Sequence, residues 1–258
     1  LGVHFAGLGL GIALAALAVE LMLRLDFDWR QQWYLLALLG VALAIPAWRW
    51  LPPPVLTSSN QQQTAMSPEP GSRFIRLMLF SYFGAGYGYV VTATFIVTIV
   101  ERLPGLSGSG NLAFVLLGLA AAPAVLVWDL LARRLGFLNA IILALLLQTL
   151  AIALPLTVPG LWPVLFSAAL FGATFIGVVS LVLTMAGRLY PTKPARLMGK
   201  LTLAYGLAQV IAPAITGVLA KATGSYQPGL LLAAGFVALA ALLLYWLKRT
   251  DQTLAQLQ

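Results

Sequence analysis

The sequence predicts an all-α protein that crosses a lipid bilayer about eight times. Hydrophobic residues make up 61% of the 258 residues and charged residues only 9%, and the mean hydropathy is +0.95. A soluble domain carries roughly 25% charged residues, because its surface faces water. The apolar stretches here are each about 20 residues long, which is enough to cross a membrane as a helix. Short breaks between these stretches hold nearly all of the charge.

Each apolar stretch is predicted to be a helix, because hydrocarbon offers no partners for free backbone N–H and C=O groups. The stretches also lack the alternating pattern of a membrane-spanning β-strand. Short turn sequences separate the later ones, such as LPGLSGSG after Arg102, ARRLG around Arg133, VPGLWP near Pro159 and GRLYPTKPARLMGK from Gly187. The predicted spans, in chain order, are Gly2–Leu23, Gln31–Leu51, Arg76–Val100, Asn111–Leu131, Phe137–Leu156, Leu161–Ala186, Leu201–Ala220 and Pro228–Leu247.

The distribution of basic residues predicts the orientation of the chain. If the first span runs outward and every span reverses direction, eleven basic residues lie on the inner side and four on the outer side. This asymmetry follows the positive-inside rule, so the net charge of +8 indicates topology and not binding of nucleic acid. The inner set is Arg49, Arg73, Arg76, Arg133, Arg134, Arg188, Lys193, Arg196, Lys200, Lys248 and Arg249, and the outer set is Arg24, Arg30, Arg102 and Lys221.

One long polar segment divides the chain. Its sequence, PPPVLTSSNQQQTAMSPEPGS, is rich in Pro, Gln and Ser, a composition that cannot build a packed core. We therefore expect two transmembrane helices in residues 1–51, a cytoplasmic linker at 52–72 and a six-helix block at 73–258. A six-helix block behind such a linker is typical of one half of a two-halved transporter, although an ordinary long loop is an equal alternative. Because Leu1 is not Met and leads directly into a span, we expect an upstream part of the protein to be missing.

Small residues predict close helix contacts at two places. Gly7, Gly9 and Gly11 lie in the first span, and the segment GAGYG from Gly84 lies in the third. Without Cβ atoms two helices can approach closely, which is how helices associate in lipid. We expect packing at the first group. In the third span the glycines could also mark a locally adaptable segment, since glycine weakens a helix by about 1 kcal/mol.

Hydroxyl and aromatic side chains in three spans are the candidates for a binding cavity. In the third span Tyr87, Thr94 and Thr98 form one stripe, and Tyr82 and Tyr89 form another. At least one stripe should face protein or a water-filled cavity, with interhelical hydrogen bonding as the alternative.

The sixth and seventh spans add weaker signals of the same kind. Phe171 and Thr174 lie on one face of the sixth span, where Thr can bond back to its own helix. In the seventh span Gln209 lies near Pro213, which removes a helix hydrogen bond and frees a carbonyl. A ligand contact and a purely structural cap are both open at Gln209.

Other chemistry has little support. Glu20 precedes Arg24 by one turn, so an ion pair is expected there; proton coupling through Glu20 is the weaker alternative. The sequence contains no Cys and no HExxH, GxSxG or P-loop motif. We therefore expect no catalytic residues, no metal site, no cofactor and no enzymatic activity.

Four segments resemble the major facilitator superfamily, and within it the uncharacterised YbfB/YjiJ-type transporters. They are FAGLGLGIALAALAVEL from Phe5, FSYFGAGYGYVVTATFI from Phe80, VWDLLARRLG from Val127 and YGLAQVIAPAITG from Tyr205. The resemblance implies two six-helix halves, of which this chain would carry the last two helices of the first half and all of the second. In WDLLARRLG, Arg134 and Gly136 match the superfamily's cytoplasmic gating motif G-x-L-x-D-R-x-G. Asp129 and Arg133 depart from that motif, and an Asp129–Arg133 pair could replace its charge relay.

The resemblance implies a secondary transporter that works by alternating access on a small solute. Its partners would be the lipid bilayer, the solute, a coupling proton as an open possibility, and the missing N-terminal helices, with no nucleic acid. Its location would be the bacterial plasma membrane, with the linker and C-terminus in the cytoplasm. A non-transporting sensor or scaffold and a lipid-modifying enzyme are the alternatives. The implied cargo contacts are Tyr82, Tyr87, Thr92, Thr94, Phe171, Thr174 and Gln209, and the implied cytoplasmic gate is Asp129, Arg133 and Arg134.

Overall fold

A computed structural model describes residues 2–50, 71–101, 108, 110–158, 160–190 and 194–250. Over these ranges the chain is all-helical, with eight helices that are long and apolar enough to cross a membrane. The predicted fold class is therefore confirmed. The helices are α1 (Gly2–Arg24), α2 (Trp29–Trp50), α3 (Ser72–Glu101), α4 (Gly110–Leu135), α5 (Phe137–Thr157), α6 (Leu161–Leu189), α7 (Pro194–Thr223) and α8 (Gln227–Thr250).

Most helices extend past the apolar windows that predicted them. The largest difference is in α7, which begins at Pro194 and not near Leu201. Proline is well suited to the first turn of a helix, where its missing N–H has no intrahelical partner. The polar turns that follow, with Arg196 and Lys200, are exposed. Hydropathy therefore predicted the apolar part of α7 but not the polar turns at its start.

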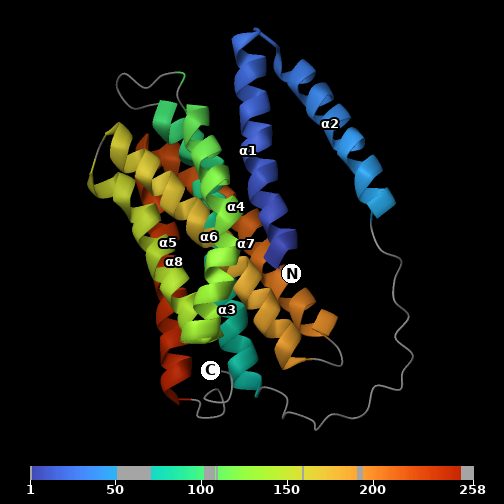
Figure 1. Ribbon diagram of the computed structural model, residues 1–258. Helices are drawn as coiled ribbons and strands as arrows, with labels where there is room; N and C mark the ends of the chain where they lie inside the picture. Colours follow the sequence, from blue (N-terminus) through green and yellow to red (C-terminus); the bar gives the residue numbers. More distant parts are fainter. Residues whose placement is uncertain are drawn as a thin grey trace.

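Helices α3 to α8 form one packed block (Figure 1). In this block α3 packs against α7 and α8, α6 packs against α4 and α5, and α5 packs against α8. Outside the block, α1 packs along α4, while α2 contacts α1 sparsely and buries no residue. The predicted linker, residues Arg102 and Lys193, and the side chain of His4 lie outside the described residues.

Small residues bring α1 and α4 together. A Cβ atom at Gly9 would collide with the backbone of Ala122, and one at Gly118 would collide with Ala13. The packing prediction is confirmed for Gly9. It is not met at Gly7 and Gly11, which are exposed and where a Cβ atom would meet nothing within 4 Å among the described residues.

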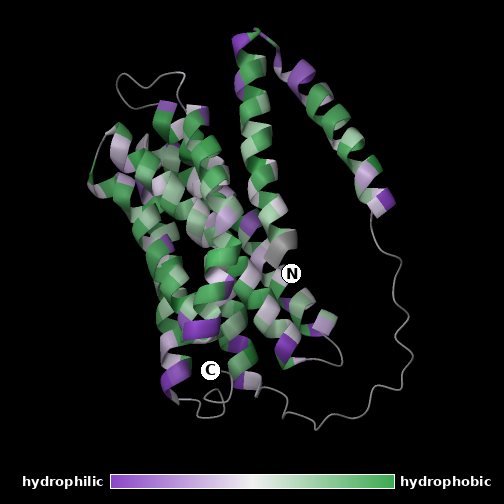
Figure 2. Ribbon diagram, in the orientation of Figure 1, coloured by the Kyte–Doolittle hydropathy of each residue, from purple (hydrophilic) through white to green (hydrophobic). Residues whose placement is uncertain are grey.

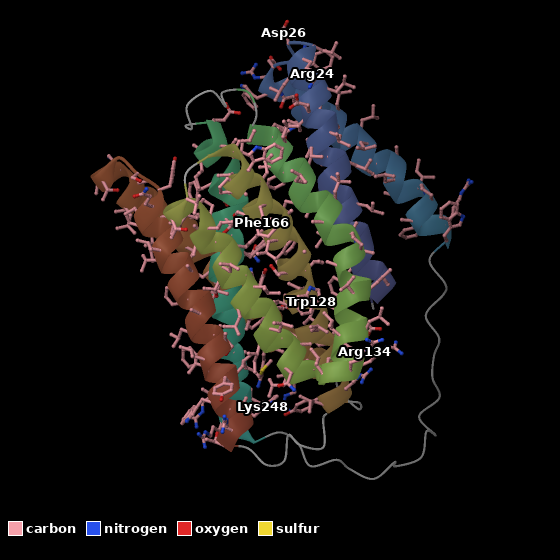
Figure 3. All side chains as sticks on the ribbon, turned by 60° about the vertical axis from the view of Figure 1, so that its left-hand side comes forward. Arg24, Asp26, Trp128, Arg134, Phe166 and Lys248 are labelled. Atoms are coloured by element: carbon pink, nitrogen blue, oxygen red, sulfur yellow. The ribbon has the colours of Figure 1, made fainter. Side chains whose placement is uncertain are left out.

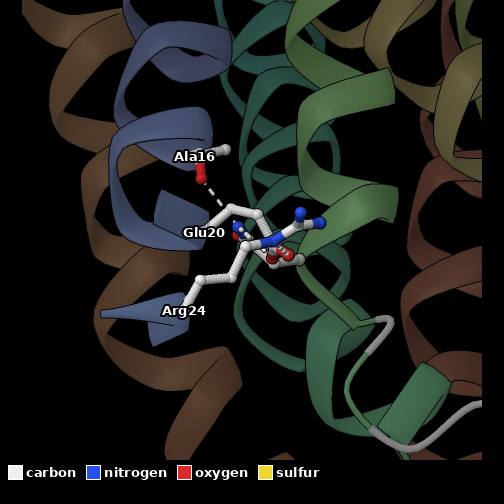
Figure 4. A network of polar contacts seen from close by, with 4 residues as sticks. Ala16, Glu20 and Arg24 are labelled. Carbon is white, nitrogen blue, oxygen red and sulfur yellow. Dashed lines mark hydrogen bonds and ion pairs between the residues drawn. The ribbon is translucent and has the colours of Figure 1, made fainter. Parts of the chain in front are cut away.

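Polar contacts join the start of α4 to α1 and to the end of α3. The Asn111 side chain donates to the Ala16 carbonyl (2.6 Å) and to Glu20 Oε2 (3.3 Å). Glu20 also accepts from Arg24 Nε at 3.0 Å, which confirms the predicted ion pair (Figure 4). On the other side, the Glu101 carboxylate accepts the backbone N–H groups of Gly108 (2.7 Å) and Gly110 (2.8 Å), and so caps the start of α4.

The most hydrophilic residues gather mainly toward the ends of the helices, and the parts between are mostly hydrophobic (Figure 2). Arg134 and Lys248 lie toward one end, and Arg24 and Asp26 lie at the opposite end (Figure 3). We call the first of these the basic end. Its described basic residues are Arg73 and Arg76 on α3, Arg133 and Arg134 on α4, Arg188 on α6, Arg196 and Lys200 on α7, and Lys248 and Arg249 on α8.

Candidate functional site

Five aromatic rings connect α3, α6 and α7 in the middle of the block. We call them the aromatic ladder: Tyr82 and Tyr89 on α3, Phe171 and Phe175 on α6, and Tyr205 on α7. The Tyr205 ring centroid lies 4.7 Å from that of Tyr82 and 5.8 Å from that of Tyr89. Tyr89 stacks on Phe175 at 5.0 Å, and Phe175 stacks on Phe171 at 5.6 Å. These separations lie in the range in which aromatic rings attract one another.

The rings differ in how accessible they are. Tyr82, Phe171 and Phe175 are buried, whereas Tyr89 and Tyr205 are half-buried. A solute that reached the ladder would therefore meet Tyr89 and Tyr205 first. The buried rings of Tyr82 and Phe175 pack against these two accessible rings, and Phe171 packs against Phe175.

Glycines in α3 make the ladder possible by allowing close approach. A Cβ atom at Gly86 would lie 2.7 Å from the Tyr205 carbonyl oxygen and 3.1 Å from its ring. A Cβ atom at Gly84 would lie 2.6 Å from the Phe236 carbonyl oxygen of α8, and one at Gly88 would collide with Val237. The glycines of GAGYG are thus contact points with α7 and α8, as the close-packing interpretation of small residues requires.

The predicted residue Tyr87 lies apart from the ladder. It is buried and stacks on Phe236 of α8 at 4.4 Å. Its hydroxyl lies near that of Thr216 on α7, but neither hydroxyl meets the geometry of a hydrogen bond with any described atom. Thr94, which shares a face of α3 with Tyr87, is exposed. The structure therefore brings Tyr82 and Phe171 together through the ladder and leaves Tyr87 and Thr94 outside it.

The two remaining threonines are buried. Thr174 on α6 donates to the carbonyls of its own helix, at Leu170 (2.8 Å) and Phe171 (3.1 Å). Thr92 is also buried, and its hydroxyl has no partner among the described atoms. The Thr174 hydroxyl therefore already donates a hydrogen bond within its own helix, whereas the Thr92 hydroxyl forms none with the described atoms.

Gln209 places polar groups beside the ladder. It lies one helical turn after Tyr205 on α7 and is half-buried. Residues four apart share a face of a helix, so the amide lies next to the accessible tyrosine. Pro213 lies inside the same helix and cannot donate a hydrogen bond to the residue four before it. The carbonyl that Pro213 frees is therefore that of Gln209.

At the basic end of α4, the predicted Asp129–Arg133 pair is present. Arg133 Nη2 and Nε each lie 2.9 Å from Asp129 Oδ2. The pair is solvent-exposed, and Arg134 beside it is exposed as well. Among the described residues only Arg133 forms an ion pair with Asp129.

Trp128, next to this pair, joins α4 to α6. Its indole Nε1 donates to the Ala173 carbonyl at 2.6 Å. A Cβ atom at Gly177 would collide with the same indole ring. The Trp128 ring therefore occupies the space beside Gly177. Trp128 directly precedes Asp129 in the chain, so this contact with α6 adjoins the Asp129–Arg133 pair. Figure 3 marks Trp128 inside the bundle, above Arg134.

Sequence reasoning did not include Tyr205, Phe175 or Trp128 among the site residues. Tyr205 precedes Gln209 by one turn, and Phe175 follows Phe171 by one turn, so the spacing of four was an available signal for both. Trp128 lies three residues before the end of the predicted span Asn111–Leu131, where a tryptophan that anchors the helix at the membrane surface is expected, yet it is buried. Its partner on α6 could not be read from the sequence.

Nothing in the described ranges groups three or more His, Cys, Asp or Glu side chains as a metal site would need. The site offers stacking rings, one amide and a freed carbonyl. Such a surface suits noncovalent binding of a solute with a flat apolar part and a few hydrogen-bonding groups.

Comparison with known proteins identifies the family. A search of curated proteins found no match to the chain. A family model described as the uncharacterised MFS-type transporter YbfB matches residues 1–245, which is nearly the whole chain and includes the ladder and the Asp129–Arg133 pair. The chain therefore belongs to the YbfB family of MFS-type transporters.

Proposed function

We propose that the protein carries a small neutral or aromatic solute across the membrane by alternating access. The observation that carries this proposal is the aromatic ladder with Gln209 at its side. Two half-buried tyrosines and an amide lie together on α3 and α7, deep within spans that are otherwise apolar. Polar groups are costly at this depth unless they are paired or face a cavity.

The proposed cargo is uncharged because the ladder offers no ionisable partner for a charged one at neutral pH. Tyr, Phe and Gln side chains stack and form hydrogen bonds, but they do not neutralise a charge. Tyr89 and Tyr205 would stack on the solute, and Gln209 would bind its polar edge. The contacts predicted at Tyr87, Thr92 and Thr94 stay predictions. The predicted residues that are buried would hold the accessible rings in position and would not contact the solute first; they are Tyr82, Phe171 and Thr174.

We propose the exposed Asp129–Arg133 pair, with Arg134, as a latch at the basic end. An exposed pair of this kind contributes at most about 1 kcal/mol, which suits a contact that must open and close. The neighbouring bond from Trp128 to the Ala173 carbonyl would transmit movement of α4 to α6. In this proposal the protein lies in the plasma membrane and the latch faces the cytoplasm, an orientation that the excess of basic residues at that end supports.

The test is transport of a library of neutral and aromatic metabolites by the complete protein in membrane vesicles. Once a cargo is found, Tyr89→Ala and Gln209→Ala are compared with wild type. Loss of one stacking or hydrogen-bonding contact of about 1.4 kcal/mol should lower transport efficiency about tenfold.

Phe166→Ala is the matched control, because Phe166 is an aromatic residue of α6 that is 59% exposed and lies outside the ladder. Its transport should equal that of wild type when protein levels in the membrane are equal. Wild-type transport by both Tyr89→Ala and Gln209→Ala would reject the ladder as the binding site. A protein that moves no compound of the library would favour a sensor or scaffold.

A further inference from the structure

The flank of the bundle has a groove that does not belong to the ladder. It lies between α3, α7 and α8, and its volume is about 380 Å³. Phe80 and Phe83 of α3, Leu207 of α7, and Leu239 and Leu243 of α8 line it, with Arg76 at one end. Of the lining side chains in the described part of the chain, that of Arg76 alone carries a charge.

Arg76 marks the end of the groove that lies near the membrane surface. It is in the second turn of α3, about 6 Å along the helix from Ser72. It is exposed, and no ion pair joins it to a carboxylate within the described ranges. An arginine at this depth extends its guanidinium toward the interface while its stem stays in apolar surroundings.

Further basic side chains lie close to that end. The Arg73 guanidinium lies over the Trp246 ring of α8, 4.4 Å from its centroid. Lys200 is exposed and lies one turn before Ala204, which lines the groove from α7. One cation therefore lines the end of an apolar groove, and two more lie within a helical turn of its lining residues on α3 and α7. Basic clusters between membrane helices attract anionic lipid headgroups.

The lining argues against another helix as the occupant. The close helix contacts described above, as of α1 on α4 and of α3 on α7, have a glycine on at least one side, and no glycine lines the groove. The groove instead has bulky rims, with Phe80 68% exposed and Leu207 50% exposed. A volume near 380 Å³ is also that of a small-molecule site, and a helix about 10 Å wide does not enter it.

The groove continues along α8 away from Arg76. A second hollow shares Phe236 and Leu239 with it and extends to Leu232 and Pro228. From Leu243 to Pro228 the helix rises roughly 22 Å. An elongated apolar chain fits this shape, with a charged group at one end only.

We propose that this groove binds one anionic phospholipid, with an acyl chain along α8 and the phosphate on Arg76. Guanidinium groups bind phosphate through paired, charge-assisted hydrogen bonds. Arg73 and Lys200 add to the positive potential, and the rims formed by Phe80 and Leu207 enclose the chain. The site lies on the flank, so its occupancy does not depend on the cargo site proposed above.

The test measures lipid binding to the purified protein by native mass spectrometry. The probes are phosphatidylglycerol and phosphatidylcholine with identical acyl chains. Wild type should bind phosphatidylglycerol more tightly. Arg76→Gln should weaken binding of phosphatidylglycerol roughly fivefold, and Arg76→Lys should restore part of the loss. Leu207→Trp, which fills the groove, should weaken binding of both lipids.

Arg188→Gln is the charge-matched control, since Arg188 is exposed at the same end but stacks on Phe137 at 4.4 Å, outside the groove. Equal losses in Arg76→Gln and Arg188→Gln would overturn the proposal, as would equal wild-type binding of the two lipids. The occupant is checked in intact membranes with p-benzoylphenylalanine at position 80. A lipid adduct supports the proposal. A crosslink to a second copy, with no lipid adduct, rejects it.

Discussion

At position 86 the absence of a side chain determines how closely α3 and α7 approach. Gly86→Ala would place a methyl group 2.7 Å from the Tyr205 carbonyl oxygen, so the two helices must separate and the ladder must shift. Overpacking of this kind costs about 1–3 kcal/mol. We expect the melting temperature of Gly86→Ala in detergent to fall by several degrees.

The control for this change is Gly206→Ala, one residue from Tyr205 on α7. A Cβ atom at Gly206 would meet nothing within 4 Å, and alanine favours a helix over glycine by about 1 kcal/mol. The melting temperature of Gly206→Ala should stay level or rise. If both variants melt together at the wild-type temperature, the contact at Gly86 does not limit the approach of α3 to α7.

The Asp129–Arg133 pair permits a second test at a single contact. Asp129→Asn removes one charge of an exposed pair, so stability should change by less than about 1 kcal/mol. A latch predicts a larger change in transport rate than in melting temperature. The double variant Asp129→Arg/Arg133→Asp keeps the pair at the same spacing and should recover most of the rate. If the double variant reaches the membrane in wild-type amounts but its transport rate does not recover, this pair does not form the latch.

At the scale of the helices, the packing of α1 on α4 depends on Gly9 and not on the nearby Gly7. Gly9→Leu would drive a side chain into the backbone of Ala122, whereas Gly7→Leu would extend into open space. We expect Gly9→Leu to displace α1 and to speed hydrogen–deuterium exchange of its amides, because the apposed α4 surface no longer protects them. Gly7→Leu should exchange like wild type. Equal exchange in all three proteins would show that α1 does not depend on this contact.

The positions of the helices were predictable from the sequence, and their rotations were not. Long apolar stretches define the eight spans because every residue in hydrocarbon must be apolar or paired. For the same reason the lipid-facing and buried faces of a span look alike. The stripes of Tyr82 with Tyr89 and of Tyr87 with Thr94 were visible in α3, but the sequence did not tell which one meets α7. That choice depends on Gly86 facing Tyr205 and Gly84 facing Phe236, which are contacts between residues far apart in the chain.

For the molecule as a whole, the charge asymmetry predicts which end faces the cytoplasm. Within the described ranges of the six-helix block, nine basic residues lie at the basic end, while the opposite end carries Lys221. The positive-inside rule predicts that the basic end faces the cytoplasm. These 258 residues contain no cysteine, so a single introduced cysteine is the only thiol within them, and labelling is read against the protein without that substitution. We expect Lys221→Cys to react with a membrane-impermeant maleimide in intact cells, and Lys200→Cys to react only after the cells are permeabilised. Both lysines are exposed on the same helix, α7, so the two variants differ chiefly in the membrane face they report. Labelling of Lys200→Cys in intact cells would reverse the orientation, and with it the assignment of the Asp129–Arg133 latch and of the anionic lipid groove to the cytoplasmic side.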